Sequence, residues 1–263
     1  VGKIARYLAY LVLFSMTLSA FKVAVDAAGH AIDRMVELMQ ALLPPMLTLL
    51  LAMGNLATAA LFKPFILGSL AFLATLLKNI VLPLFFLAAI LNLLNYISDQ
   101  YKLNKFAGLL EFGGKFVLGL VMTVFLGVMT IHGATGGVAD GVALRTAKYS
   151  ADLIPVIGKY FKDAMELVVS SGLLLKNALH IIGLIAVAII CLTPLLKIVS
   201  MLIVFKVSAA IIEPLGEKTL ADSLQTVSQS LLLIFATMAC VGLMFFITIA
   251  VVAAAGNYAV MLR

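Results

Sequence analysis

One stretch of this chain, residues 65–98, contains a single charged side chain, Lys78, among residues that are mostly apolar. A single helix over this stretch would reach about 51 Å, well beyond the roughly 30 Å hydrocarbon core of a bilayer. Further long apolar runs occupy residues 8–25, 115–133, 177–212 and 228–255. Charged residues are only 11% of the chain, against about 25% in soluble domains, so the apolar surface is too large for water to be the solvent. Because the runs are continuous and not alternating, they predict an all-α polytopic membrane protein and not a barrel.

Prolines are expected to interrupt this helical pattern. Pro83 divides the run 65–98 and Pro194 divides the run 177–212, so each run is predicted to be one kinked helix or two short helices that meet as a membrane hairpin. Amphipathic helices are expected between the runs, at 26–41, 99–113, 153–176 and 213–227. The first of these is predicted to end at Pro44-Pro45.

The chain carries a weak internal repeat at an offset of 111 residues. Phe14, Arg34, Pro44 and Pro83 have partners at Phe125, Arg145, Pro155 and Pro194. Two of the three prolines in the second half fall on this offset, which gives the repeat its weight. Repeats of this kind in membrane proteins predict two related units built about a common axis.

The repeat suggests a division of one integral membrane domain, 1–263, into two units. These are expected at 8–133 and 153–263, with a polar connector at 134–152 that overlaps the start of the second unit. Three crossings in each unit would make the copies inverted, and four would make them parallel. An inverted repeat is favoured because the charged segment 153–176 is not expected to cross the membrane.

Three lysines, Lys78, Lys197 and Lys206, lie inside apolar runs, where ionisable residues are the usual first candidates for function. They would line a wet pathway or pair with acidic residues of a partner, or their long stems would carry the charge to an interface. The two prolines that divide the runs would free backbone carbonyls within the membrane, or would only kink the helix to fit its packing. The candidate pathway or helix-break residues are Lys78, Asn79, Pro83, Pro194, Lys197 and Lys206.

A second set of candidates lies near the middle of the chain, where the segment 153–176 presents a mixed-charge helix face. Such a face is either solvated or a docking surface. The candidate partner-binding residues are Asp140, Arg145 and Lys148 of the connector, with Lys159, Lys162, Asp163 and Glu166 after it.

Patterns of catalysis, metal binding and cofactor binding are missing from the sequence. His30, His132 and His180 are far apart, and none has the spacing of a zinc protease. No phosphate-binding loop of the form G-x-x-x-x-G-K-[ST] occurs. Cys191 and Cys240 lie in apolar runs and are interpreted as small buried side chains. The net charge of +6 is thinly scattered, which fits lysines facing anionic lipid and does not predict nucleic acid as a partner. We therefore expect neither an enzyme nor a metal or cofactor site.

Four stretches of the chain resemble a known family. They are HGATGGVADGVALRTAKYSADLIPVIGKYFKDAMELVVSSGLLLKNA (132–178), LLKNIVLPLFFLAAILNLL (76–94), DQYKLNKFAGLL (99–110) and GNYAVMLR (256–263). They are similar to the stage III sporulation protein AE family of endospore-forming bacteria. Family members carry an additional N-terminal signal and extracytoplasmic region, which is expected to be absent here.

The resemblance implies a multi-pass protein of the mother-cell membrane around the forespore. It implies a non-enzymatic member of the channel or secretion complex that links the two cells and is needed for forespore development. The implied partners are other membrane and ring-forming proteins of that complex and the lipid bilayer, and a homo-oligomer is a further expectation. Such a protein would either form or scaffold the conduit. An alternative, favoured by the repeat and the broken runs, is a secondary transporter or permease-like protein for a small solute.

Overall fold

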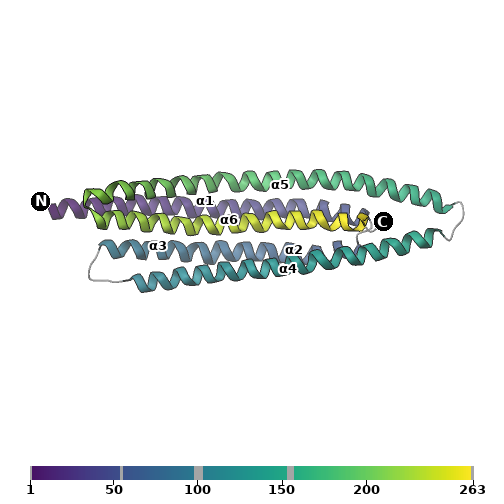
Figure 1. The fold of residues 1–263 in the computed structure, drawn as a ribbon, viewed down its shortest axis with the longest axis horizontal. Coiled ribbons are helices and arrows are strands. Elements are labelled where there is room, and N and C mark those ends of the chain that lie inside the picture. The colour runs from purple at the N-terminus through teal and green to yellow at the C-terminus, as the bar shows by residue number, and fades with distance from the viewer. Residues whose placement is uncertain (1, 54–55, 98–102, 153–156, 262–263) are drawn as a thin grey trace. The chain divides into compact units, whose positions relative to one another are not determined.

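The structure is a computed structural model that describes the backbone of residues 2–53, 56–97, 103–152 and 157–261. Side chains are described for residues 8, 10–53, 56, 59–60, 68–96, 103–131, 167 and 170–254. Within these residues the chain is helical and contains no strand (Figure 1). The α-helices are α1 (Gly2–Ala52), α2 (Leu56–Leu76), α3 (Leu82–Ile97), α4 (Asn104–Asp152), α5 (Ile157–Ile212) and α6 (Lys218–Met261). A π-helix, η1 (Leu77–Val81), connects α2 to α3, and a 3-10 turn, η2 (Glu213–Leu215), follows α5.

Five helical stretches in the described part of the chain are long and apolar enough to cross a membrane. They are Tyr10–Ala52, Gly68–Tyr96, Asn104–Ile131, Ser170–Leu215 and Lys218–Ala254. A helix suits this environment because it satisfies its own backbone hydrogen bonds where no water is present to do so. The prediction of an all-α protein is confirmed, and the apolar helices support a multi-pass membrane protein.

The expected end of a helix at Pro44-Pro45 is wrong, because α1 continues through both prolines to Ala52. Each proline removes one helical hydrogen bond. The neighbouring side chains of Leu43, Met46 and Leu50 are at most 1% exposed, so packing holds this part of α1 in place. Tertiary packing supplies most helix stability, and an open turn in lipid would leave more backbone groups unpaired than the two prolines do.

Of the two alternatives for the proline-divided runs, the membrane hairpin is wrong, because the helical backbone continues at both Pro83 and Pro194. Pro194 lies in the interior of α5. At Pro83 the helical backbone continues from α2 through η1 into α3, and the N–H of Leu82 donates to the carbonyl of Leu77, five residues earlier. A proline ring ordinarily clashes with the carbonyl four residues before it, and the wider π turn relieves that clash.

The polar stretch 134–152, expected as a connector, belongs to helix α4. Its three glycines, Gly136, Gly137 and Gly141, do not interrupt the helix. A single glycine costs a helix about 1 kcal/mol relative to alanine, which a helix of this length can accommodate.

The described helices form two compact units, and each is described by itself. Unit 1 comprises Val1–Arg34, Ala74–Val121 and Ile189–Gly242, and unit 2 comprises Met35–Leu73, Met122–Ala188 and Leu243–Arg263. Each unit takes segments from both of the units predicted from the repeat. The repeat and its inverted arrangement stay predictions.

Close approach of helices in unit 1 depends on small residues. Figure 1 shows α3 beside the first part of α4, where Gly114 abuts the ring of Phe85. A methyl group at Gly114 would lie 2.9 Å from Cζ of Phe85. Gly242 of α6 likewise faces Cys191 of α5, with 2.8 Å between an added methyl group and Sγ. Small residues let helices approach closely, which favours packing in membranes.

Unit 2 has a core rich in methionine. The buried methionines are Met35, Met39, Met46, Met53, Met129 and Met244. Methionine is flexible and polarizable, so it fills irregular gaps between helices. Phe125, Phe245 and Ile249 also belong to this core, and each is at most 1% exposed.

Candidate functional site

An ion pair at the π-helix joins two distant parts of the chain within unit 1. Lys78 lies in η1, and its Nζ is 2.6 Å from both carboxylate oxygens of Asp33 on α1. Gly29 lies one helical turn before Asp33, and a methyl group added there would lie 3.6 Å from Cε of Lys78, so the lysine stem passes close to α1. The side chain of Lys78 is 33% exposed and that of Asp33 is 45% exposed, so solvent partly screens the attraction between their charges. A carboxylate that accepts from one ammonium through both oxygens neutralises it locally, and Lys78 is therefore paired inside its own chain.

The other two candidates of this region lie at the surface, Asn79 within η1 and Pro83 in the first turn of α3. Asn79 and Pro83 are both exposed. Pi-helical turns occur often at functional sites, and this one carries both the predicted lysine and the turn before the predicted proline.

The candidates on α5 occupy different environments. Pro194 is buried, whereas Lys197 and Lys206 are exposed. The carbonyl of Lys197 accepts a hydrogen bond from the Ser200 hydroxyl at 2.8 Å. Neither lysine side chain forms an ion pair with another described residue. The structure therefore does not join Lys78, Lys197 and Lys206 into one polar cluster.

The candidate partner-binding residues belong to α4 and α5, but their side chains lie outside the described residues. They are Asp140, Arg145, Lys148, Lys159, Lys162, Asp163 and Glu166. Their role stays a prediction.

A polar contact that was not predicted links α3 to α4 in unit 1. Glu111 accepts a hydrogen bond from the amide of Asn92 at 2.9 Å and pairs with Lys115 at 3.1 Å. Sequence reasoning assigned the surrounding stretch to an amphipathic helix without finding this contact. Nineteen residues separate Asn92 from Glu111, so no local spacing marks them.

Unit 2 holds a second unpredicted feature, the buried pair Lys176 and His180 on α5. Lys176 is 1% exposed and His180 is 7% exposed. Lys176 stood at the end of a charged, amphipathic segment, and this pattern suggested solvent. His180 lies inside the apolar run, four residues after Lys176. This spacing puts both side chains on one helix face, and it is the sequence signal that could have indicated their shared burial.

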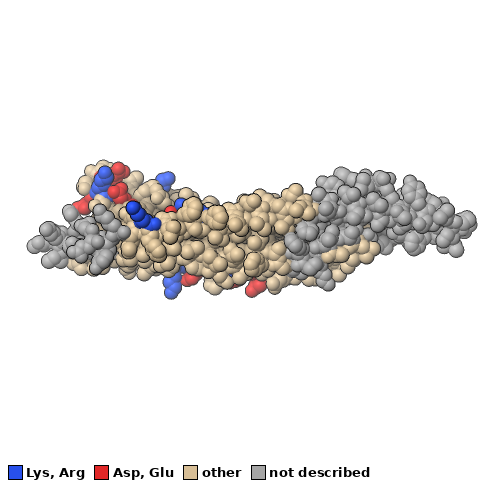
Figure 2. All heavy atoms as spheres, turned by 90° about the horizontal axis from the view of Figure 1, so that it is seen from below, with Lys and Arg blue, Asp and Glu red and all other residues tan. Residues whose placement is uncertain are grey.

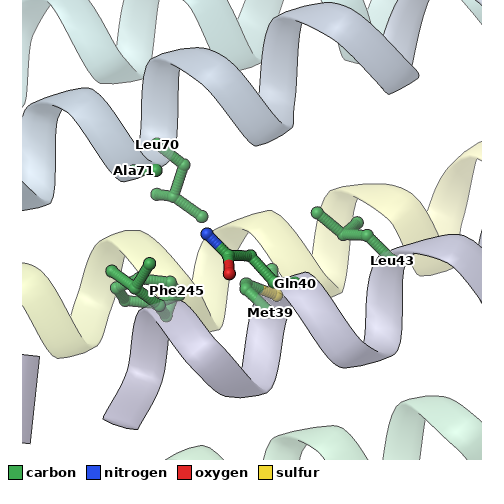
Figure 3. Close-up of a pocket in the computed structure, with 7 residues that line it drawn as sticks. Met39, Gln40, Leu43, Leu70, Ala71 and Phe245 are labelled. Atoms are coloured by element: carbon green, nitrogen blue, oxygen red, sulfur yellow. The ribbon is translucent and has the colours of Figure 1, made fainter. Parts of the chain in front are cut away.

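A small cavity in unit 2 is lined by apolar side chains and one amide. Its lining residues are Val36, Met39, Gln40, Leu43, Leu70, Ala71 and Phe245. Figure 3 shows the amide of Gln40 extending from α1 toward Leu70 of α2. The cavity volume is about 180 Å³ including open space, below the roughly 300 Å³ at which ligand pockets usually begin. It offers no ionisable group for chemistry.

Among the described residues, no three His, Cys, Asp or Glu side chains gather in a way that could hold a metal ion. Neither cysteine is in a disulfide; Cys191 is buried and Cys240 is partly buried.

Comparison with known proteins gives a consistent result. A family described as stage III sporulation protein AE matches residues 1–256 of this chain. A protein of Bacillus subtilis (strain 168) named "Stage III sporulation protein AE" is 39% identical over 264 residues, which is 100% of this chain and 66% of the relative. The chain thus spans just under two thirds of that relative's length. No solved structure matches the chain.

Proposed function

Because this chain belongs to the stage III sporulation protein AE family, we propose that it is a non-enzymatic membrane component of a sporulation channel or secretion complex that links mother cell and forespore. It resides as a multi-pass protein in the mother-cell membrane around the forespore, where forespore development needs it. Its partners are other membrane and ring-forming proteins of that complex, the lipid around it and further copies of itself.

The observation that carries this proposal is the outward position of Lys197 and Lys206 on an otherwise apolar helix face. Both lysines are exposed on α5 in unit 1. Large apolar side chains around them are exposed too, among them Leu196 at 60%, Val204 at 61% and Val207 at 51%. On the face drawn in Figure 2, most of the described surface is likewise neither basic nor acidic.

A cation on a lipid-facing helix surface is unfavourable, by about 2.5–3.5 kcal/mol at the middle of a membrane span. Contact with protein or with a water-filled passage removes that cost. Lys197 has no carboxylate partner among the described residues, and we propose that groups of a neighbouring subunit compensate its charge. A subunit whose cationic face is completed by its neighbours fits an assembly better than a self-contained transporter.

The interior of each unit supports the same choice. Lys78 is neutralised by Asp33, which leaves it poorly suited to line a polar path. The cavity shown in Figure 3 is small and mainly apolar, so it does not favour a permease for a polar solute.

Charge reversal on α5 tests the assembly role. Lys197→Glu and Lys206→Glu are introduced into the gene in a sporulating host, and the tagged protein is purified with its partners. We expect reduced recovery of partners and fewer mature spores. Lys105→Glu makes the same change at an exposed site in the first turn of α4 and serves as the control, with normal recovery expected. Normal recovery and spore counts in both α5 variants would refute the proposal.

Removal of charge without reversal separates a conduit from a scaffold. In Lys197→Leu the apolar stem remains but the cation is lost. A conduit lined by this lysine predicts an intact complex with fewer mature spores, whereas a scaffold predicts that partners no longer co-purify. If complex and spores are both normal, this face has neither role.

A further inference from the structure

Two ionisable side chains of α5 are buried one helical turn apart in unit 2. Lys176 and His180 are 1% and 7% exposed. The Nζ of Lys176 donates to the backbone carbonyl of Ala253 on α6 at 2.6 Å. Both ring nitrogens of His180 are buried without a hydrogen-bond partner among the described residues.

This arrangement leaves hydrogen-bonding capacity unused in an apolar setting. An ammonium group has three donors, and one of those of Lys176 is used. A neutral imidazole has one donor and one acceptor, and both are open at His180. Each unsatisfied buried group costs about 1–3 kcal/mol, and hydrocarbon offers no water to reduce that cost. An orphaned group of this kind needs an explanation, and in membrane spans the usual one is function.

The surrounding side chains that the structure describes supply no counter-ion. Residues 243–254 of α6, 68–73 of α2 and 122–131 of α4 carry no ionisable group. Glu37 of α1 is the remaining ionisable side chain described in unit 2; it is exposed and forms no ion pair with Lys176. Two positive charges four residues apart on a helix repel each other, and burial strengthens that repulsion. One positive charge at this site is therefore much lower in free energy than two.

Close packing on both sides of the pair limits what can bind there. A methyl group at Gly172 would lie 2.7 Å from Cγ of Met53, and one at Gly183 would lie 2.9 Å from Cδ1 of Leu42. Just before the pair, Gly172 brings α5 close to Met53, the residue that follows α1, and just after it Gly183 brings α5 close to α1 itself. A polyatomic ligand would need space between the helices, whereas a proton needs none.

We propose that Lys176 and His180 form an intramembrane proton-binding site that holds a single proton, on one side chain or on the other. A hydronium ion gives its proton to the free electron pair of a neutral nitrogen in the pair and leaves as water, and release reverses this step. The carbonyl of Ala253 accepts from the ammonium when the proton resides on Lys176. Titratable side chains in membrane spans are a recurrent means of moving protons. This site is separate from the assembly face on α5 and does not depend on it.

The test counts protons on the full chain in lipid nanodiscs. Difference titration measures uptake from about pH 9 to about pH 5, a range that includes the ordinary histidine titration. The reference is the double variant Lys176→Met/His180→Leu, which has no proton site. The unchanged chain is expected to take up one proton more than the reference. Each single variant, Lys176→Met or His180→Leu, is also expected to take up one more, because either nitrogen can hold the shared proton.

Two further variants sharpen the count. Lys176→Arg retains a donor for Ala253 but never releases its proton, so it is expected to match the double-variant reference. Asn177→Leu removes polarity from an exposed neighbour and is expected to match the unchanged chain. A difference of zero or two protons between the unchanged chain and the reference overturns the proposal, and so does full uptake in Lys176→Arg.

Two further controls test whether each variant is folded and whether the site binds an anion. Each variant must keep the helical circular dichroism of the unchanged chain. Any variant that loses this signal is replaced by Lys176→Gln or His180→Gln. These variants retain a polar group, and the number of protons that we expect them to take up is the same. Replacement of chloride by gluconate is expected to leave the count unchanged. A count that follows chloride would mean that the site binds an anion and would also overturn the proposal.

Discussion

We expect the ion pair between Lys78 and Asp33 to make a measurable contribution to stability. Lys78→Met removes the ammonium and leaves the Asp33 carboxylate without the partner that lies 2.6 Å from both of its oxygens. Fully exposed pairs contribute about 0.2–1 kcal/mol, and removal of one member of a buried pair costs about 3–5 kcal/mol. The side chains are 33% and 45% exposed, so solvent screening brings the contribution of this pair closer to the range for exposed pairs than to the range for buried ones. We expect a coupling free energy of about 1–2 kcal/mol, a factor of roughly 5 to 30 in the folding equilibrium.

A double-mutant cycle measures this coupling directly. Lys78→Met, Asp33→Asn and the double variant are unfolded reversibly in bicelles, and the free energies of unfolding are compared. The swapped variant, Lys78→Asp/Asp33→Lys, is expected to recover part of the loss because the opposite charges again face each other. Lys197→Met is the matched control, since that lysine is exposed and has no ion pair among the described residues.

The result that would refute this reasoning is additivity. If the two single changes sum to the double change within about 0.3–0.5 kcal/mol, the residues are not coupled. A loss in Lys197→Met as large as that in Lys78→Met would also refute it, because the effect would then come from removing any lysine.

Three further changes test the packing of unit 1 by thermal unfolding. Gly114→Ala places a methyl group against the ring of Phe85 and should destabilise the protein by about 1–3 kcal/mol. Gly113→Ala is the control, because its added methyl group meets nothing within 4 Å and should not destabilise the protein. Equal effects of the two changes would contradict this packing. Gly216→Ala forces a side chain onto a backbone with φ of 89° and should cost about 1 kcal/mol, so an unchanged melting temperature would argue against that turn. Tyr96→Phe removes a hydroxyl that is hydrogen-bonded to α6 at 2.9 Å and should cost about 0.5–1.5 kcal/mol; no loss would mean that this bond is unimportant.

Local rules for proline predict a helix end at Pro44-Pro45 and allow a hairpin at Pro83 and at Pro194, and the structure contains none of these. The rules describe the cost of proline correctly, but packing and the lack of water oppose a break. Before Pro83 the backbone forms a π-helical turn, and no pattern of residues in the sequence indicates that turn. At Pro44 and Pro45 the deciding groups are buried side chains on both sides, and their burial depends on helices elsewhere in the chain.

The lysines illustrate the same limit at the candidate site. The sequence singled out Lys78 as an ionisable residue in an apolar run, but its partner Asp33 is 45 residues away on another helix. Lys176 looked like part of a charged segment and is buried, while Lys197 looked equivalent to Lys78 and is exposed. Nothing in the spacing of these three lysines distinguishes their environments.

The sequence by itself determined that this protein is helical and suited to a membrane, because both follow from the length of apolar runs and the scarcity of charge. Its family resemblance was also readable from contiguous stretches, and the comparisons confirm it. Only the tertiary structure decided which charges are paired, buried or exposed, and how the helical backbone continues at each proline. Those outcomes depend on which faces of distant helices meet, and the free energy of a buried lysine is set by the groups around it and not by its neighbours in the chain.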